Sequence, residues 1–181
     1  EDHTLFVTIS QSGETADTLA ALEYARAEKY VGIVTICNVP TSTMARNADW
    51  KIFTNAGPEI GVASTKAFTT QLAALLMLAL SIAKSQDKNA KKRKQATQEL
   101  RETPALVDEA FSLKENISQI TQNISTKHNA LFLGRGMYFS IAQEGALKLK
   151  EISYIHAEAY PAGELKHGPL ALVDEQIPVI A

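Results

Sequence analysis

Two short and almost entirely apolar segments near the N-terminus constrain the fold of this chain more than any other feature. Residues 4–10 (TLFVTIS) and 31–37 (VGIVTIC) lack the polar alternation of a strand with one solvated face. Residues 17–29, which lie between them, carry apolar side chains at helical spacing. Strands that are apolar on both faces and joined by helices are typical of a covered parallel sheet. The sequence therefore predicts an α/β fold of doubly wound parallel sheets flanked by helices.

The next elements extend this pattern. We expect a short helix over residues 41–47, a third strand over 50–55 and a long helix over 66–84 that is buried on most sides. The longest apolar run, residues 72–83, is shorter than the roughly 20 residues that a bilayer-spanning helix needs. We therefore predict a core helix and no membrane span.

The composition changes after Ser85. Residues 86–127 are polar and contain no glycine, and their apolar positions recur every three or four residues, at Leu106, Ala110, Leu113, Ile117, Ile120 and Ile124. This spacing predicts two amphipathic helices, with Pro104 opening the second.

A second strand–turn–helix unit follows, with a strand over 130–133, a glycine turn over 134–136 and a helix over 140–154. We therefore predict a first α/β module over residues 1–85, a helical connector over 86–127 and the start of a second module over 128–181. The chain begins at Glu1 rather than Met and ends within an apparent strand, so we expect a fragment in which both modules are truncated.

Charge and cysteine content exclude several function classes. The chain has 18 Lys and Arg against 20 Asp and Glu, a balance that gives no reason to expect a nucleic acid or an anionic membrane as partner. The basic run at residues 91–94 is interpreted as a solvated helix face. A single cysteine, Cys37, permits no internal disulfide, so a cytoplasmic location is expected. The four histidines show no ligand spacing, and we expect neither a metal nor a cofactor.

The loop over residues 10–15 (SQSGET) joins the first strand to the first helix. Anions bind at helix N-termini because backbone N–H groups are unpaired there and the helix dipole is positive. Ser10, Ser12 and Thr15 add hydroxyl donors, which suits a phosphate monoester. Neither nucleotide-binding glycine motif is present. The alternative is plain capping of the helix by a serine with a Glu or Thr partner.

Three further groups of residues are candidates for chemistry. Glu144, Lys148 and Glu151 share one helix face, and the alternative is a surface ion-pair ladder. His167 lies among glycines and a proline, where a proton shuttle is one interpretation and a histidine bonded to a backbone carbonyl the other. The segment around Val62 and Ser64 precedes the long helix, so Ser/Thr capping of that helix is possible alongside ligand contact.

The loop over residues 10–15 resembles the phosphate loop of sugar isomerase (SIS) domains. Three more segments are similar to the isomerase half of the glucosamine-6-phosphate synthases, the glutamine–fructose-6-phosphate aminotransferases (isomerizing). They are residues 61–66 (GVASTK), 144–152 (EGALKLKEI) and 159–169 (AYPAGELKHGP). The resemblance covers essentially the whole chain.

The resemblance implies a role for each candidate residue. Phosphate is expected on Ser10, Gln11, Ser12 and Thr15, and the sugar on Val62 and Ser64. Glu151 would move a proton between two sugar carbons, Lys148 would stabilise and protonate developing oxygen charge, and Glu144 would at most hold Lys148. His167 would assist ring opening from the neighbouring subunit, which implies a homodimer.

The resemblance also implies a glutaminase domain that supplies ammonia, and no N-terminal catalytic cysteine is present here. We therefore expect that this chain alone does not form glucosamine 6-phosphate from glutamine. Two rival functions remain: a non-catalytic SIS sensor of sugar phosphates, and a SIS isomerase or deglycase that does not use glutamine.

Overall fold

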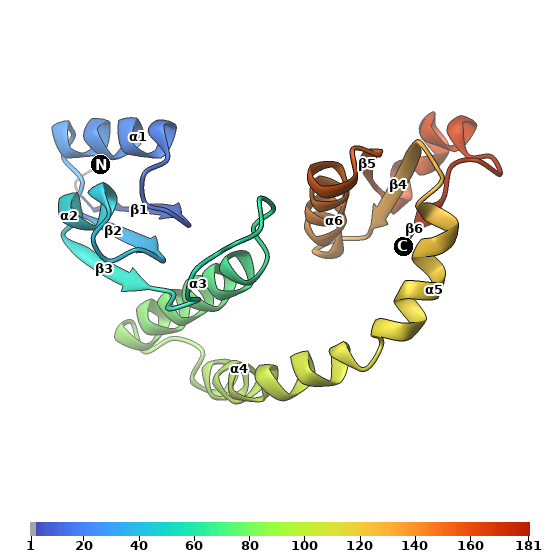
Figure 1. Cartoon of the computed structure of the whole chain (residues 1–181). Coiled ribbons are helices and arrows are strands. Elements are labelled where there is room, and N and C mark those ends of the chain that lie inside the picture. Colours follow the sequence, from blue (N-terminus) through green and yellow to red (C-terminus); the bar gives the residue numbers. More distant parts are fainter. Residues whose placement is uncertain (1–2) are drawn as a thin grey trace. The chain divides into compact units, whose positions relative to one another are not determined.

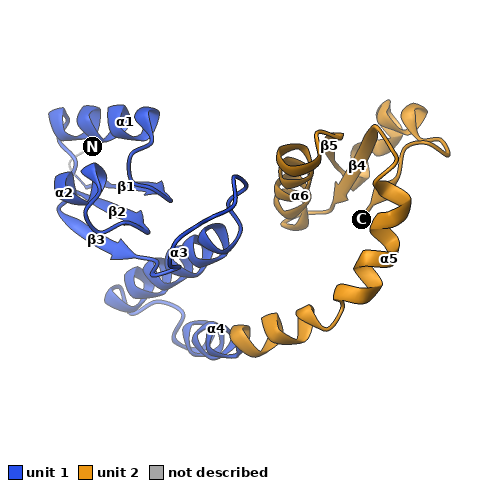
Figure 2. Cartoon of the chain, viewed as in Figure 1, with its two compact units in different colours: residues 1–102 blue, residues 103–181 orange. Residues whose placement is uncertain are grey.

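The computed structural model describes residues 3–181, which form strands and helices in the alternating order predicted above (Figure 1). Contacts divide the chain into two compact units, unit 1 over residues 1–102 and unit 2 over 103–181 (Figure 2). The division falls inside the segment predicted as a connector. The three-part organisation therefore stays a prediction.

Unit 1 contains a parallel sheet with the strand order β1-β2-β3. The strands are β1 (Leu5–Ser10), β2 (Gly32–Cys37) and β3 (Trp50–Phe53). Ser10 pairs with Cys37, and Cys37 pairs with Phe53. All three strands thus end at one edge of the sheet, and the loops that follow β1, β2 and β3 begin there.

Helices pack against both sides of the central strand. α1 (Ala16–Ala27) and α2 (Thr43–Asn47) form one buried cluster with the sheet, made of Leu22, Ala25, Ile33, Met44 and Ala48. Val34 and Ile36 are also buried, and strand alternation directs them to the opposite face, where α3 (Lys66–Ser85) contacts β2. The prediction of a parallel sheet with flanking helices is confirmed.

The expectation that the long helix is buried on most sides is wrong for the described residues. Only Ala67 and Ala74 of α3 are buried, while Leu72, Leu76, Met77 and Ile82 are 40–49% exposed. In unit 1, α3 contacts the sheet mainly at β2. Because this contact is narrow, it buries only small side chains and leaves the rest of the apolar face of α3 exposed to solvent. By length and composition alone, this helix of 20 residues could also cross a membrane, a property shared by core helices of water-soluble proteins.

The connector forms two helices, but not at the predicted boundary. α4 (Ala90–Phe111) continues through Pro104, and α5 (Lys114–Ile124) begins ten residues later. A proline inside a helix removes one backbone hydrogen bond and its ring crowds the carbonyl four residues earlier, but α4 continues on both sides of Pro104. Along the predicted apolar stripe, Leu106, Leu113, Ile117 and Ile120 are more than half exposed, whereas Ile124 packs against the core of unit 2.

Unit 2 contains a second parallel sheet with the order β5-β4-β6. Its strands are β4 (Asn129–Gly134), β5 (His156–Pro161) and β6 (Val179–Ile180). α6 (Tyr138–Ser153) packs on β4 and β5 around a core of Ala130, Ala146, Ile155 and Ala157. Two short 3₁₀ helices follow β5, η1 (Ala162–His167) and η2 (Pro169–Leu172).

Candidate functional site

The loop after β1 folds around the hydroxyl of Ser10. This hydroxyl accepts a hydrogen bond from the amide of Gly13 (3.0 Å) and lies 2.8 Å from the Thr15 hydroxyl. Ser12 accepts a hydrogen bond from the amide of Glu14 (3.1 Å). Three hydroxyl groups and the start of α1 are therefore brought together at the carboxyl edge of the sheet.

This loop is also fixed to the N-terminus of α2. Gly13 has a φ of 67°, and its carbonyl accepts a hydrogen bond from the amide of Met44 (3.1 Å). Glu14 accepts a hydrogen bond from the amide of Thr43 (2.6 Å), and this bond is the main reason why the pKa of Glu14 is lowered. Ser42 caps α2 by accepting a hydrogen bond from the amide of Ala45 (3.3 Å).

The structure does not support plain capping of α1 by this loop. Thr15 is the N-cap residue but makes no side-chain capping bond, because its hydroxyl is directed to Ser10. The Ser12 hydroxyl is bonded to an amide within the loop rather than to the helix. Asp17 lies in the first turn of α1 and caps none of its amides among the described residues. The first-turn amides of α1 therefore remain available to an anion.

Val62 and Ser64 lie on the loop between β3 and α3, which begins next to the same sheet edge. The side chain of Asn38 anchors the start of this loop by donating to the carbonyl of Gly57 (2.7 Å) and accepting from the amide of Ala56 (2.8 Å). Val62 is 97% exposed, whereas Ser64 is half-buried. The structure does not join these two residues to the loop over residues 10–15 by any hydrogen bond between the side chains it describes.

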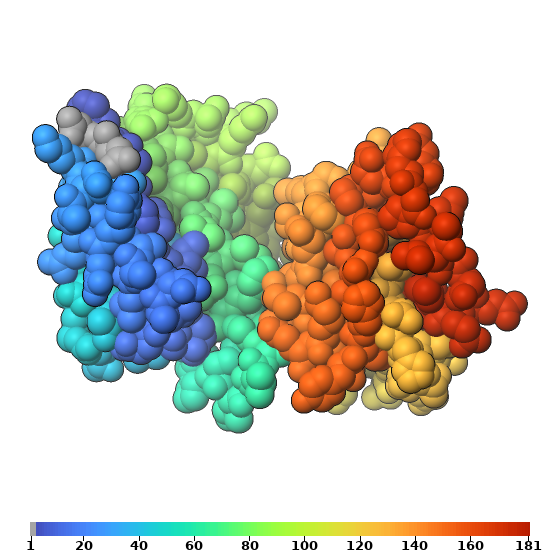
Figure 3. All heavy atoms as spheres, turned by 90° about the horizontal axis from the view of Figure 1, so that it is seen from above, coloured from blue at the N-terminus to red at the C-terminus, as the bar shows by residue number. Residues whose placement is uncertain are grey.

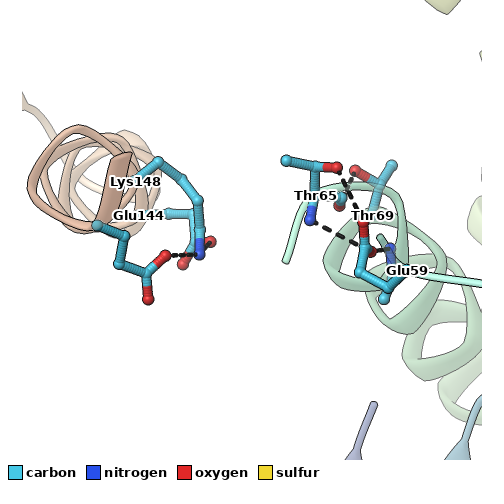
Figure 4. Close-up of polar contacts among 7 residues, drawn as sticks. Glu59, Thr65, Thr69, Glu144 and Lys148 are labelled. Atoms are coloured by element: carbon cyan, nitrogen blue, oxygen red, sulfur yellow. Dashed lines mark hydrogen bonds and ion pairs between the residues drawn. The ribbon is translucent and has the colours of Figure 1, made fainter. Parts of the chain in front are cut away.

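The cap of α3 is a residue that the sequence analysis missed. Thr65 is the N-cap residue but makes no side-chain capping bond, so the Ser/Thr capping that the sequence left open is not observed. Instead Glu59 accepts hydrogen bonds from the amides of Thr65 (3.4 Å) and Ala67 (3.1 Å). Figure 4 shows Glu59 beside Thr65. Glu59 precedes the N-cap by six residues, beyond the reach of local capping motifs, and no sequence signal marked it.

Glu144, Lys148 and Glu151 form the ion-pair ladder that their spacing permits. The Lys148 ammonium lies 2.6 Å from Glu151 and 3.5 Å from Glu144, the latter pair labelled in Figure 4. The three side chains are 22–33% exposed and lie on the side of α6 opposite the buried Ala142 and Ala146. The bond to Glu151, followed by the charge of Glu144, raises the pKa of Lys148, so this lysine stays charged at neutral pH.

His167 ends η1 and is exposed. Its side chain makes no hydrogen bond within residues 3–181, so bonding to a backbone carbonyl is not observed. The next residue, Gly168, has a φ of 141°, a conformation that favours glycine. No hydrogen bond or ion pair links His167 to the ladder on α6. Among the described residues, no group of three His, Cys, Asp or Glu side chains is arranged to hold a metal ion.

Comparison with known proteins identifies relatives along the whole chain. The SIS domain family matches residues 1–81 and 123–181, which include the strands of both sheets and most of α3. Glutamine–fructose-6-phosphate aminotransferase [isomerizing] of Legionella pneumophila (strain Paris) is 57% identical over 180 residues. The match covers 99% of this chain and 29% of that relative. The chain thus spans less than a third of the length of this curated relative.

Solved structures agree with this assignment. The C-terminal domain of glucosamine-fructose-6-phosphate aminotransferase from Francisella tularensis has a TM-score of 0.92 and 57% identity, covering 97% of this chain and 50% of that one. A glucosamine-6-phosphate deaminase from Thermotoga maritima has a TM-score of 0.76 and 26% identity, covering 99% of this chain and 52% of that one.

Proposed function

Since the chain belongs to the SIS domain family, we propose that it is the sugar-phosphate isomerase part of a glutamine–fructose-6-phosphate aminotransferase. It would bind fructose 6-phosphate and form glucosamine 6-phosphate with ammonia. The observation that carries the proposal is the uncapped N-terminus of α1 beside the hydroxyls of Ser10, Ser12 and Thr15.

The phosphate group is assigned to this loop. Backbone amides and hydroxyls supply hydrogen bonds, and the dipole of α1 supplies positive potential without a lysine. Gln11 extends from the same loop, and its carbonyl accepts a hydrogen bond from the amide of Asn38 (3.1 Å), which holds the backbone in place. The sugar is assigned to Val62 and Ser64.

Proton transfer is assigned to α6. Ammonia converts the C2 ketone of the open sugar to an imine with loss of water, and Glu151 then removes a proton from C1 and delivers it to C2 through an enolamine. The charged Lys148 stabilises negative charge on oxygen, which its raised pKa supports. A positioned acid or base of this kind contributes about 10²- to 10⁴-fold to the rate. His167, which has no partner within the described part of its own chain, would assist ring opening in the neighbouring subunit of a homodimer.

The remaining assignments follow from the family. We propose a cytoplasmic enzyme without a cofactor, in which a glutaminase domain supplies the ammonia. A SIS isomerase or deglycase that does not use glutamine is the second candidate, because the Thermotoga maritima deaminase matches 99% of the chain. The identity of 57% to the aminotransferases, against 26% to the deaminase, favours the first. A non-catalytic SIS sensor would not need Glu151, Lys148 and His167 together.

A calorimetric titration of the chain with fructose 6-phosphate tests the phosphate assignment. We expect saturable binding, and Ser12→Ala should weaken it by about tenfold or more, because hydrogen bonds to charged groups contribute roughly 1.5–3 kcal/mol. Ser118→Ala, which changes an exposed serine of α5, serves as the matched control and should bind as the unmodified chain does. Equal affinities in all three proteins would contradict the assignment.

The chain alone is expected to form no glucosamine 6-phosphate from glutamine and fructose 6-phosphate. Cys37 is the single cysteine, and it is fully buried at the end of β2, so no thiol is accessible to attack glutamine. Product analysis of the purified chain by mass spectrometry checks this. Formation of glucosamine 6-phosphate above the level of a protein-free control would show that the expectation is wrong.

A further inference from the structure

We infer that Glu59 is a positioning residue that sets the shape of the sugar-contacting loop, defined here as residues 60–65, by capping α3 from outside the helix. This inference rests on the proposed function in that it assigns the loop to the sugar. It adds a residue that touches no substrate and acts through the backbone on Val62 and Ser64.

The geometry shows how a single carboxylate closes this loop. One oxygen of Glu59 accepts from the amides of Thr65 (3.4 Å) and Ala67 (3.1 Å), and the other accepts from the Thr65 hydroxyl (3.4 Å). These contacts, drawn in Figure 4, join the residue before the loop to the first turn of α3. Thr65 has φ −120° and ψ −78°, which is not the extended conformation of an ordinary N-cap, so the helix start depends on the carboxylate.

The loop has few other anchors of its own. Ile60 and Val62 are 93% and 97% exposed, and the loop protrudes from the surface of unit 1 in Figure 3. Ala63 is its one buried side chain. Without Glu59, Ser64 and Val62 would be held by Ala63 alone, and the loop would sample many backbone conformations before a ligand could bind. Fixing the loop in one conformation on binding would cost conformational entropy, and this cost would lower the affinity for the sugar.

Because Glu59 is charged, the N-termini of α1 and α3 would also bind different kinds of ligand group. The N-terminus of α3 is occupied by a carboxylate, which satisfies its dipole and repels a second anion. The N-terminus of α1 carries no side-chain cap. Phosphate would therefore favour α1, while the α3 loop would present neutral donors and acceptors to hydroxyl groups. This arrangement would orient a sugar phosphate in one direction only.

The experiment compares two ligands and two readouts on the chain. Calorimetric titration with fructose 6-phosphate and, separately, with inorganic phosphate is applied to the unmodified chain, Glu59→Ala, Glu59→Gln and Glu59→Asp. Hydrogen exchange of the amides of residues 60–67 is followed in parallel. Glu23→Ala, which removes an exposed glutamate from α1, is the matched control.

Glu59→Ala is expected to weaken fructose 6-phosphate binding about 2- to 30-fold, the range of a lost helix cap, and to speed amide exchange at Thr65 and Ala67. The affinity for inorganic phosphate should stay unchanged, because phosphate alone does not reach the loop. Glu59→Gln keeps one acceptor oxygen, so its affinity for fructose 6-phosphate should lie between those of the unmodified chain and Glu59→Ala. Glu59→Asp, whose side chain is one methylene shorter, should resemble Glu59→Ala. Glu23→Ala should match the unmodified chain.

Unchanged amide exchange in Glu59→Ala would overturn the cap. Faster exchange with unchanged fructose 6-phosphate affinity would overturn the positioning role. An equal loss of affinity for both ligands would show that Glu59 only stabilises the fold, and would also overturn this role. If the unmodified chain binds neither ligand, the proposed function fails at that point, whereas amide exchange still decides whether Glu59 caps α3.

Discussion

Replacing Glu151 with glutamine is expected to slow the exchange of the C1 proton of fructose 6-phosphate by about 10²- to 10⁴-fold. The amide of glutamine is close in size to the carboxylate but cannot accept a proton at neutral pH. It also leaves Lys148 with only Glu144, at 3.5 Å, as a charged partner. The pKa of Lys148 should therefore fall from its raised value, because the bond to Glu151 is the largest cause of the shift.

The measurement uses a hybrid enzyme in which residues 1–181 replace the matching segment of the Legionella pneumophila relative. Loss of the C1 proton signal in heavy water, followed by NMR, reports the proposed step without glutamine. Glu175→Gln, at an exposed position of unit 2, is the matched control and should exchange at the unmodified rate. Exchange in Glu151→Gln within a factor of a few of the unmodified hybrid would exclude Glu151 as the base and favour a sensor.

Replacing Gly13 with alanine is expected to abolish measurable binding of both fructose 6-phosphate and inorganic phosphate, and to destabilise unit 1. A non-glycine residue at the φ of 67° costs roughly 1–2 kcal/mol. In addition, a Cβ atom at Gly13 would lie 2.2 Å from the hydroxyl of Ser42, which is buried and caps α2. Relief of this clash must move either the loop over residues 10–15 or the start of α2.

Gly136→Ala is a matched control, because Gly136 also has a positive φ (58°) but has no atom within 4 Å of its added Cβ. Chemical denaturation should show a larger loss of unfolding free energy for Gly13→Ala than for Gly136→Ala. The double variant Gly13→Ala/Ser42→Gly removes the clash and should recover part of the difference. Equal losses in the two single variants would show that Ser42 does not restrict this loop.

The sequence was most informative where a pattern depends on neighbouring residues. Apolar runs of strand length predicted β1, β2 and β4, because a strand buried on both faces must be apolar at every position. The spacing of Glu144, Lys148 and Glu151 predicted a shared helix face, and the structure shows both ion pairs. The segment over residues 10–15 was predicted to join the first strand to the first helix, and the structure places it between β1 and α1.

Patterns that depend on distant partners were less reliable. The apolar composition of α3 predicted burial, but burial depends on what covers a helix, and only two of its alanines are buried among the described residues. Pro104 was expected to open a helix, yet continuous turns on both sides hold it inside α4. Hydrophobic spacing also could not show that Leu106, Ile117 and Ile120 lie exposed.

The sequence by itself determined the α/β class, the parallel arrangement and the residue types available for phosphate and proton chemistry, because local propensity and periodicity encode these. Only the tertiary structure decided how helix ends are satisfied. It left α1 without a side-chain cap because the Thr15 hydroxyl is directed to Ser10, and it brought the carboxylate of Glu59 to the N-terminus of α3. Hydrogen bonds between residues several positions apart depend on how a loop closes, and loop closure is a property of the folded backbone rather than of neighbouring residues.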